Sequence, residues 1–485
     1  MAAPAWAGRP RPPLQERSLP TDPCFMAATE LLAAYRSRTL SPVEAVQAVF
    51  ARIRALDPKI NGFCAFWEDE AMAAARASAA RWTSGEPAGA LDGVPVSIKD
   101  LMLVAGKPMG RGSLTSSPQD IATEDAPAVA RLREAGAIFL GRTTTPEFGW
   151  KGCGDSPLTG ITRNPWDLTR NPGGSSSGAA TAVATGMGPL ATGSDGGGSI
   201  RMPAGFCGIY GLKATYGRVP AYPASSYGTL SHTGPMTRTV GDAALMLGVM
   251  AQPDPRDWQA LPPSATDWPA TLPGGVAGWR IAYSPRLGYA RVDPEIADLV
   301  RRAAQRFAEL GAVVEEADPG FADPIDIFRI HWYAGAANLM RRIPADKQAV
   351  MDPGLREIAA EGTKIGLLDY MAAMGEREAM GQRMNQFFGT YRVLLTPTLP
   401  LPAFEAGEEV PKGSGMRRWF EWTPFSFPFN LTRHPAATIP CGTTRAGLPA
   451  GLQIVGASFD EASVLRASRA YEETRPFVPP PMARA

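Results

Sequence analysis

The sequence predicts an α/β protein in which helices alternate with the strands of a largely parallel or mixed sheet. Two segments show the same order of elements: an acidic residue opens a helix, a glycine closes it, and a short apolar strand follows. They begin at Asp125 and at Asp293. With 45% hydrophobic residues, a chain of 485 residues can also bury the large core that such a fold requires.

The first predicted helix covers residues 41–58. Ser41 and Glu44 are spaced as a capping box, and Pro42 occupies the first helical position. Apolar residues then recur at helical spacing as far as Asp57-Pro58, namely Val46, Val49, Phe50, Ile53 and Leu56. This pattern predicts an amphipathic helix.

The two helix-to-strand segments come next. The first runs from Asp125 through Ala135, closes at Gly136 and continues as a strand over 137–140; the second starts at Asp293-Pro294, closes at Gly311 and continues over 312–314. Upstream, the apolar run 94–98 is typical of a strand and places Lys99 at its end. The run 243–251 has the length of a buried helix segment rather than of a membrane span.

Composition excludes several functions. Lys+Arg 48 and Asp+Glu 47 leave a net charge of +1 without a long run of one sign, so neither nucleic acid nor a membrane is an expected partner. The 51 Gly and 47 Pro indicate many tight loops in a folded chain. Residues 1–24 read as a Pro/Arg-rich tail without the apolar core of a secretory signal, and 476–485 as a Pro-rich tail.

The numbers and spacing of cysteines and histidines limit which metal sites, disulfides and catalytic bases the chain can contain. The five cysteines are scattered and form no C-x-x-C pair, which argues against a disulfide framework or a zinc site and favours the cytoplasm. His232, His331 and His434 are the only histidines, so we expect no metal and no cofactor. A reaction that needs a base at neutral pH must then use another residue type.

Two Gly/Ser clusters, 173–178 and 196–199, are the strongest chemical signal. A serine on a Gly-rich turn, such as Ser199, is accessible to substrate, and the successive amides of Gly196, Gly197 and Gly198 can converge on one oxyanion. Serine needs a base for activation. Lys99, at the end of an apolar strand, could serve if burial lowered its pKa from about 10.4.

These residues resemble the amidase signature family. The resemblance rests on Lys99, the GGSS cluster at 173–176, the SDGGGSIR segment at 194–201, and three further segments at 207–213, 234–240 and 447–456. It extends from about Met26 to Glu473. It implies one domain over 25–475, with a central mixed, twisted β-sheet covered on both faces by helices.

The resemblance also implies a Ser–cis-Ser–Lys triad. Ser199 would be the acylated nucleophile, Ser175 the bridging serine on a cis peptide bond after Gly174, and Lys99 the final base. Further site residues are expected in three roles: the oxyanion-hole amides of Gly196, Gly197 and Gly198; the supporting residues Ser176, Asp195 and Arg201; and the substrate-binding pair Gly149 and Trp150, which fall where fatty acid amide hydrolases line the acyl pocket.

The sequence departs from the family pattern at Ser177 and Ala179, where Gly and Ser are common, and at His434, where Gly is frequent. Residues 318–430 are expected to be less regular and to form a variable substrate-lid region. Their aromatic side chains fit either core packing or an apolar substrate channel: Trp332, Tyr333, Trp419, Phe420, Trp422, Phe425, Phe427 and Phe429.

The expected function is a serine amidohydrolase acting on a small-molecule amide or carbamate, with esters as further substrates, as a monomer or homodimer. One alternative is a component resembling the A subunit of a tRNA-dependent amidotransferase; the segment 230–233 differs from the Ser-Leu-Asp-Gln common there. A second is an α/β-hydrolase elbow with Ser176 as nucleophile and His331 or His434 as base. A phosphate-binding loop at 196–199 lacks the required Lys and Ser/Thr.

Overall fold

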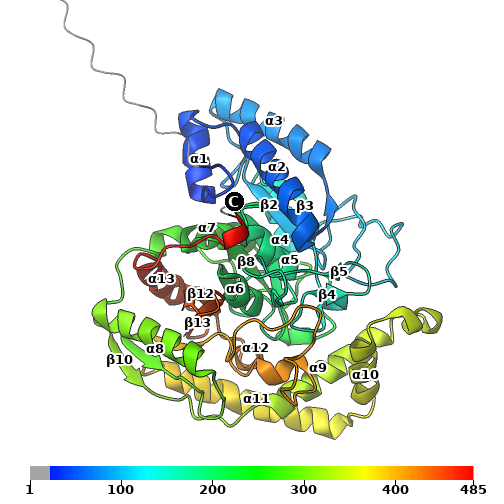
Figure 1. Ribbon diagram of the computed structural model, residues 1–485, viewed down its shortest axis with the longest axis vertical. Helices are drawn as coiled ribbons and strands as arrows, with labels where there is room; N and C mark the ends of the chain where they lie inside the picture. The colour runs from blue at the N-terminus through cyan, green and yellow to red at the C-terminus, as the bar shows by residue number, and fades with distance from the viewer. Residues whose placement is uncertain (1–21, 484–485) are drawn as a thin grey trace, which may run out of the picture.

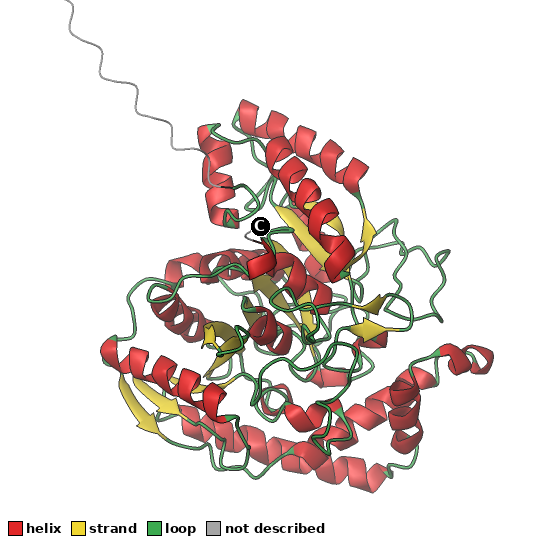
Figure 2. Cartoon of the chain, in the orientation of Figure 1, coloured by secondary structure: helices red, strands yellow, loops and turns green. Residues whose placement is uncertain are grey.

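The computed structural model describes residues 22–483 (Figures 1 and 2). Within them, eleven strands form one sheet in the order β1-β3-β2-β6-β8-β7-β12-β13-β11-β9-β10, and β4 pairs with β5 separately. The strands are β1 Phe63–Phe66, β2 Pro95–Lys99, β3 Ile138–Thr143, β4 Asp155–Ser156, β5 Gly160–Ile161, β6 Leu190–Asp195, β7 Tyr210–Lys213, β8 His232–Thr237, β9 Arg280–Tyr283, β10 Val313–Glu316, β11 Val393–Pro397, β12 Ala436–Thr443 and β13 Pro449–Gly456.

The sheet is mixed, as predicted. Strands β3, β2 and β6 are parallel, and so are β11, β9 and β10 at the other end. Between these groups the pairings from β6 through β8, β7, β12 and β13 to β11 are antiparallel, and β1 joins β3 antiparallel at the edge.

The helices lie around this sheet, with α2 and α3 at one end of the molecule and α8 and α11 at the other (Figure 1). The α-helices are α1 Ala28–Ser37, α2 Pro42–Ile60, α3 Glu68–Ser84, α4 Pro127–Glu134, α5 Ser177–Ala184, α6 Arg201–Cys207, α7 Val240–Met250, α8 Pro294–Glu309, α9 Ile325–Met340, α10 Pro353–Gly362, α11 Leu367–Phe388, α12 Pro428–Leu431 and α13 Glu461–Glu472. The 3₁₀ turns are η1 Glu147–Gly149, η2 Gly228–Leu230, η3 Pro269–Thr271, η4 Ala345–Val350, η5 Trp419–Trp422 and η6 Pro481–Ala483.

Helices cover both faces of the sheet, as strand β6 shows. Its neighbouring residues Leu190 and Ala191 point to opposite faces because side chains alternate along a strand. Leu190 belongs to an apolar cluster with residues of α4, α7, α8 and α13, and Ala191 to a second cluster with α5 and α6. The predicted α/β layering is therefore confirmed, and α5 and α6 mark the face that carries the Gly/Ser clusters.

Two predicted helix starts agree with the structure. Ser41 Oγ accepts the Glu44 N–H at 3.2 Å and Glu44 accepts the Ser41 N–H in return, so the capping box of α2 is present. Asp293 caps α8 through the N–H groups of Glu295 and Ile296. Helix α2 ends at Ile60, two residues beyond the predicted end, with Pro58 inside its last turn.

The predicted acidic cap at Asp125 is wrong. The N-cap of α4 is Ala126, and its side chain accepts no bond. The Asp125 carboxylate instead accepts the Ala105 N–H at 2.7 Å and an Arg133 Nε–H at 2.7 Å. The Asp125 carboxylate, which the spacing predicts to cap the N-terminus of α4, is therefore bound by a loop amide and an arginine side chain instead.

The expectation that 318–430 is less regular is also wrong, because the segment contains the long helices α9 and α11 and the shorter α10. Most of its aromatic rings are buried; Trp332, Trp419, Trp422 and Phe427 belong to one apolar cluster together with Phe206 of α6. Helix α9 is apolar on several sides, so it lacks the one-sided pattern that identifies a surface helix. Core packing thus accounts for most of these rings.

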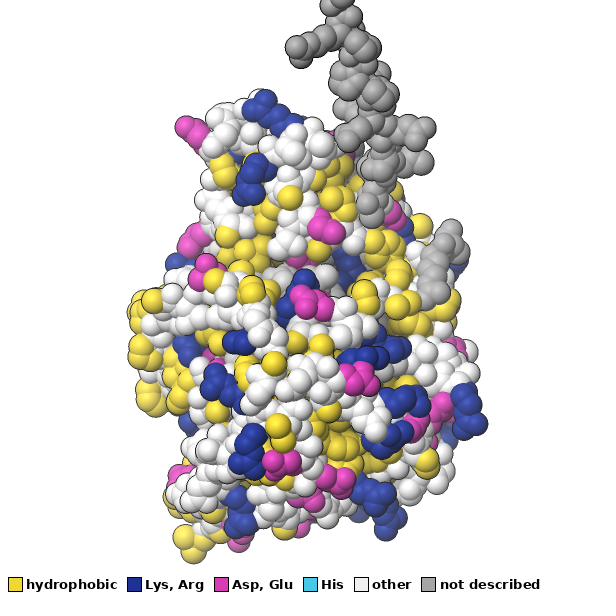
Figure 3. All heavy atoms as spheres, turned by 90° about the vertical axis from the view of Figure 1, so that its left-hand side faces the viewer, with side chains coloured by type: hydrophobic (Ala, Val, Ile, Leu, Met, Phe, Trp, Pro, Cys, Tyr) yellow, Lys and Arg dark blue, Asp and Glu magenta, His cyan; other side chains and the backbone are white. Residues whose placement is uncertain are grey.

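The ends of the chain pack differently from the predicted tails. Residues 1–21 lie outside the described residues, whereas Cys24 is buried against the body of the protein. At the other end, the Ala483 carbonyl accepts an Arg52 N–H at 3.1 Å, so the Pro-rich segment lies on α2. Acidic and basic side chains are interspersed on the face seen in Figure 3. Among the described residues, no helix combines the length and apolar composition needed to cross a bilayer.

Candidate active site

Lys99 lies at the end of β2 with its amine in a ring of serine hydroxyls. Lys99 Nζ is 2.8 Å from Ser175 Oγ, 2.8 Å from Ser176 Oγ and 2.9 Å from Ser194 Oγ. The backbone N–H of Lys99 donates to Thr192 Oγ1 at 2.9 Å, which ties β2 to β6 at this level. The sheet thus delivers the lysine to the serine cluster, as the sequence predicts.

Burial controls the charge of Lys99. Its side chain is completely buried, and this desolvation lowers its pKa well below the ordinary lysine value, against the opposing effect of the Asp195 carboxylate. A neutral amine has two N–H donors and one lone pair. Lys99 is therefore able to accept a proton from one of the hydroxyls around it.

The surrounding bonds narrow the choice of the hydroxyl that can donate to Lys99. Ser176 Oγ donates to the Ser194 carbonyl at 3.3 Å, so toward Lys99 it acts as an acceptor. Ser175 Oγ and Ser194 Oγ each have Lys99 as their only side-chain hydrogen-bond partner within residues 22–483, so either hydroxyl is free to give its proton to the lysine lone pair. The Gly174–Ser175 peptide bond is cis, as the family resemblance implies.

The two Gly/Ser clusters meet at the backbone. The Ser176 N–H donates to the Ser199 carbonyl at 3.1 Å, and Ser175 and Ser199 are 2% and 3% exposed. Among the contacts of the described residues there is no hydrogen bond between the hydroxyls of Ser175 and Ser199. The structure therefore brings the three predicted triad residues to one place and contains a hydrogen bond between Lys99 and Ser175.

The glycine loop connects β6 to α6. The Gly198 N–H donates to Asp195 Oδ1 at 2.7 Å, so this amide is already engaged. Within the described part of the chain, the amides of Gly196, Gly197 and Ser199 donate to no protein acceptor. The loop is held from outside by indole rings, since a Cβ at Gly196 would lie 3.0 Å from Trp332 and one at Gly197 2.7 Å from Trp419.

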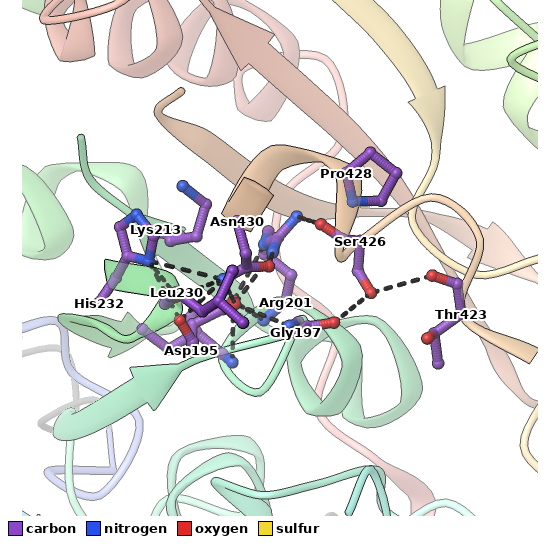
Figure 4. A network of polar contacts seen from close by, with 12 residues as sticks. Asp195, Gly197, Arg201, Lys213, Leu230, His232, Thr423, Ser426, Pro428 and Asn430 are labelled. Carbon is purple, nitrogen blue, oxygen red and sulfur yellow. Dashed lines mark hydrogen bonds and ion pairs between the residues drawn. The ribbon is translucent and has the colours of Figure 1, made fainter. Parts of the chain in front are cut away.

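Asp195 and Arg201 form a buried ion pair behind this loop (Figure 4). Arg201 Nη2 is 2.9 Å from Asp195 Oδ1 and Arg201 Nε 3.0 Å from Oδ2, with both side chains fully buried. Burial would raise the Asp195 pKa, but the charge and hydrogen bonds of Arg201 outweigh it and hold that pKa well below its usual range. The Asn430 amide also donates to Asp195 Oδ1, at 2.9 Å.

Gly149 and Trp150, the predicted substrate-binding pair, differ in their positions. Gly149 borders the serines: a Cβ there would lie 3.1 Å from Ser175 Oγ and 2.8 Å from Leu101. Trp150 is 1% exposed, and its carbonyl accepts the Trp332 indole N–H at 3.1 Å. Gly149 thus lies beside Ser175, whereas Trp150 contacts a ring that packs against the glycine loop.

Sequence reasoning missed several residues of this site. Ser194 precedes the expected Asp195, and its place two residues after Thr192 on β6 puts both on the face toward Lys99. The alternation of side chains along β6 was therefore a sequence signal that could have identified Ser194. Ser426 and Asn430 had no local signal, because they reach the glycine loop from more than 220 residues away in the chain.

The α/β-hydrolase alternative does not fit this geometry. Ser176 Oγ is hydrogen-bonded to Lys99 Nζ. The nucleophile of such an elbow directly follows a strand, but here the preceding strand β5 ends at Ile161, well before α5 begins at Ser177. His434 Nε2 faces Asn385 and Ser458, and the His331 ring packs on Tyr370. Burial lowers the pKa of His331 to about 4 and that of His434 to about 3. Neither histidine is placed to activate Ser176.

A buried lysine of lowered pKa, hydrogen-bonded to serine hydroxyls beside a glycine loop on an α/β sheet, is the arrangement expected of a serine hydrolase with lysine as its candidate base. The family model described as Amidase matches residues 44–465. The chain therefore belongs to the amidase family, as the resemblance predicted. It is an amide-hydrolysing enzyme with the amidase signature.

Individual relatives agree with this assignment. An acylamidase from Rhodococcus erythropolis is 38% identical over 460 residues, covering 93% of this chain and 96% of that protein. The A subunit of the glutamyl-tRNA(Gln) amidotransferase of Myxococcus xanthus is 36% identical over 474 residues, covering 92% and 97%. The crystal structure of a bacterial aryl acylamidase of the amidase signature family superposes with a TM-score of 0.87 at 31% identity, covering 93% and 96%.

Proposed function

We propose that Ser199 is the acylated nucleophile, Ser175 the proton relay and Lys99 the base. The observation that supports this most is the buried Lys99 amine 2.8 Å from Ser175 Oγ, on the serine that follows the cis peptide bond. Ser176 and Ser194 hold the amine in place, and Asp195 with Arg201 orients the loop that carries Ser199.

The proposed acylation conserves protons throughout. Ser199 Oγ bonds to the amide carbon and gives its proton to Ser175, which passes its own to the Lys99 lone pair. The C–N bond then breaks, and the departing nitrogen keeps the electron pair and takes a proton from Ser175 as Lys99 returns one to Ser175. Water hydrolyses the acyl-enzyme by the same relay, so that amide and water yield acid and amine.

The oxyanion of each tetrahedral intermediate needs donors that are free. The sequence pointed to Gly196, Gly197 and Gly198. Because the Gly198 N–H is donated to Asp195, we propose the amides of Gly196, Gly197 and Ser199 as the donors and assign Gly198 to the shape of the loop.

Covalent trapping tests the nucleophile. Mass spectrometry after treatment with a fluorophosphonate should locate the adduct on Ser199, and the Ser199→Ala variant should remain unlabelled. An adduct on Ser176, or full activity of Ser199→Ala, would refute the assignment. Ser177→Ala is the matched control, since Ser177 lies in the same cluster and its hydroxyl has no partner within the described residues.

For the substrate, we propose an apolar or aryl amide, with aryl carbamates and esters as further substrates of the same acyl chemistry. Support comes from the similarity to an acylamidase and an aryl acylamidase. Turnover of p-nitroanilides and aryl carbamates should exceed that of small charged amides. Hydrolysis restricted to small charged amides would contradict this proposal.

The similarity to the A subunits of amidotransferases makes a partner-dependent enzyme the competing proposal. At the differing segment 230–233, the His232 ring is buried and its Nδ1 lies 2.8 Å from the Leu230 carbonyl. We propose a free-standing amidase, as a monomer or homodimer in the cytoplasm; its five free cysteines fit a reducing compartment. Hydrolysis of an anilide by the purified chain alone, without ATP, would separate the two proposals.

A further inference from the structure

The peptide group between Gly197 and Gly198 is held at both ends by side chains (Figure 4). Its carbonyl oxygen accepts the Ser426 hydroxyl at 2.6 Å, and its N–H donates to Asp195 Oδ1 at 2.7 Å. A peptide group is planar, so two bonds on its opposite edges fix the rotation of the whole plane. This matters in a glycine pair, where the backbone otherwise rotates with little steric resistance.

From this arrangement we infer that Ser426 is a positioning residue for the oxyanion-binding amides. The inference rests on the proposed function. Two of the three amides assigned to the oxyanion, those of Gly197 and Ser199, belong to the peptide groups on either side of the held plane. Rotation of the Gly197–Gly198 plane would turn both neighbours, and the Ser426 hydroxyl opposes that rotation from the carbonyl side.

Ser426 is itself rigidly placed. It is fully buried, its carbonyl accepts an Arg201 N–H at 2.8 Å, and the preceding carbonyl, of Phe425, accepts the Gln453 amide at 2.8 Å. Arg201 also holds Asp195, so both anchors of the Gly197–Gly198 peptide are fixed by one guanidinium. At Gly198, φ is +126°, and an added Cβ would lie 2.6 Å from Ser426 Cβ, so only glycine fits against the serine.

The hydroxyl has two acceptors within reach, the Gly197 carbonyl at 2.6 Å and the Thr423 carbonyl at 3.2 Å. It has one proton, which goes to the nearer oxygen. The bond to Thr423 closes a local turn in the same segment. The bond to Gly197 joins two parts of the chain separated by 229 residues and is the one that bears on the glycine loop.

The test compares Ser426→Ala with Thr432→Val. Thr432 is a buried hydroxyl on the same segment, and it donates to the Pro428 carbonyl without contacting the glycine loop. For Ser426→Ala we expect kcat on an anilide to fall about 10- to 100-fold, less than the ~10²–10³-fold loss of an oxyanion donor itself, with little change in KM. Thr432→Val should retain the activity of the unaltered enzyme.

A second readout separates positioning from a general packing role. A trifluoromethyl ketone forms a tetrahedral adduct with the nucleophile and places an oxyanion at the proposed donors, whereas the parent carboxylic acid binds only in the ground state. Ser426→Ala should weaken ketone inhibition by the same factor as kcat/KM and leave inhibition by the acid unchanged. Equal weakening of both inhibitors, or of neither, would overturn the inference.

Ser426→Cys covers the case in which Ser426→Ala unfolds, because the thiol keeps the volume but is a weak donor; its activity should lie between those of the alanine variant and the unaltered enzyme. Activity of Ser426→Cys equal to that of the unaltered enzyme would count against the inference. Failure of the proposed function is recognised separately: an active Ser199→Ala variant removes the oxyanion chemistry itself, whereas an inactive Ser199→Ala beside a fully active Ser426→Ala refutes only the role of Ser426.

Discussion

Lys99 Nζ and Ser175 Oγ lie 2.8 Å apart at the end of strand β2, and neither side chain is exposed by more than 2%. The distance places the lysine amine and the serine hydroxyl in direct contact, and burial lowers the pKa of the amine, which favours its uncharged form. A serine hydrolase with such a Lys–Ser pair needs no histidine as a base. Within residues 22–483, the hydrogen bonds of Lys99 Nζ go to serines alone.

The first prediction concerns the pH dependence of catalysis. Only neutral Lys99 accepts a proton, so kcat/KM should rise with pH as the amine loses its proton and then reach a plateau. Because burial lowers the Lys99 pKa, the rise should have its midpoint well below the ordinary lysine value of about 10.4. A pH–rate profile on a neutral anilide measures this.

Lys99→Arg supplies the control for that profile, since a guanidinium keeps its proton at every accessible pH. We expect kcat to be lower by about 10²–10⁴-fold throughout, with no rising limb. An arginine variant with a normal profile would show that another group titrates.

The second prediction concerns Gly149, whose φ is +71°. In Gly149→Ala the new Cβ would lie 3.1 Å from Ser175 Oγ, so kcat should fall about 10- to 100-fold as the relay shifts. Gly275→Ala is the matched control, with φ +61° and nothing within 4 Å of the added Cβ. Both variants should lose about 1–2 kcal/mol of unfolding free energy, but only Gly149→Ala should lose activity. Equal kcat values would contradict the proximity of Gly149 to the relay.

The third prediction concerns the buried ion pair. Arg201→Met leaves the Asp195 carboxylate buried without its cation and should lower the free energy of unfolding by ~3–5 kcal/mol. Arg280→Met is the control because its pair with Glu315 is exposed on both sides, at 52% and 37%, and should cost under ~1 kcal/mol. Urea denaturation compares them, and similar losses in the two variants would refute a special role for the buried pair.

The fourth prediction concerns acid stability. Burial lowers the pKa of His331 to about 4, below the value of about 6.5 expected in the unfolded chain. On acidification the unfolded state therefore binds the proton first, and stability present above pH 6.5 is lost as the pH falls toward 4, by about 3 kcal/mol in full. Urea midpoints between pH 7 and pH 4.5 should fall less steeply for His331→Gln, and identical slopes would be the contrary result.

The sequence predicted several of the residues that the structure brings together around Lys99. Lys99, the two Gly/Ser clusters and the α/β alternation were all readable because each depends on residues close together in the chain: a strand that ends in a lysine, or glycines beside a serine. Family resemblance added the cis bond at Ser175, which the structure contains. Spacing failed at Asp125, because its carboxylate binds the Ala105 amide of a loop and the Arg133 side chain rather than the first N–H groups of α4.

Only the tertiary structure decided how the glycine loop is held. Asn430, Ser426 and the indole rings of Trp332 and Trp419 reach it from a different part of the chain, and no local pattern records such contacts. The direction of each amide depends on backbone torsions that glycine leaves open, so the engagement of the Gly198 N–H by Asp195 could not be read from three consecutive glycines. The sequence places flexible glycines next to Ser199, and long-range hydrogen bonds give their backbone one orientation.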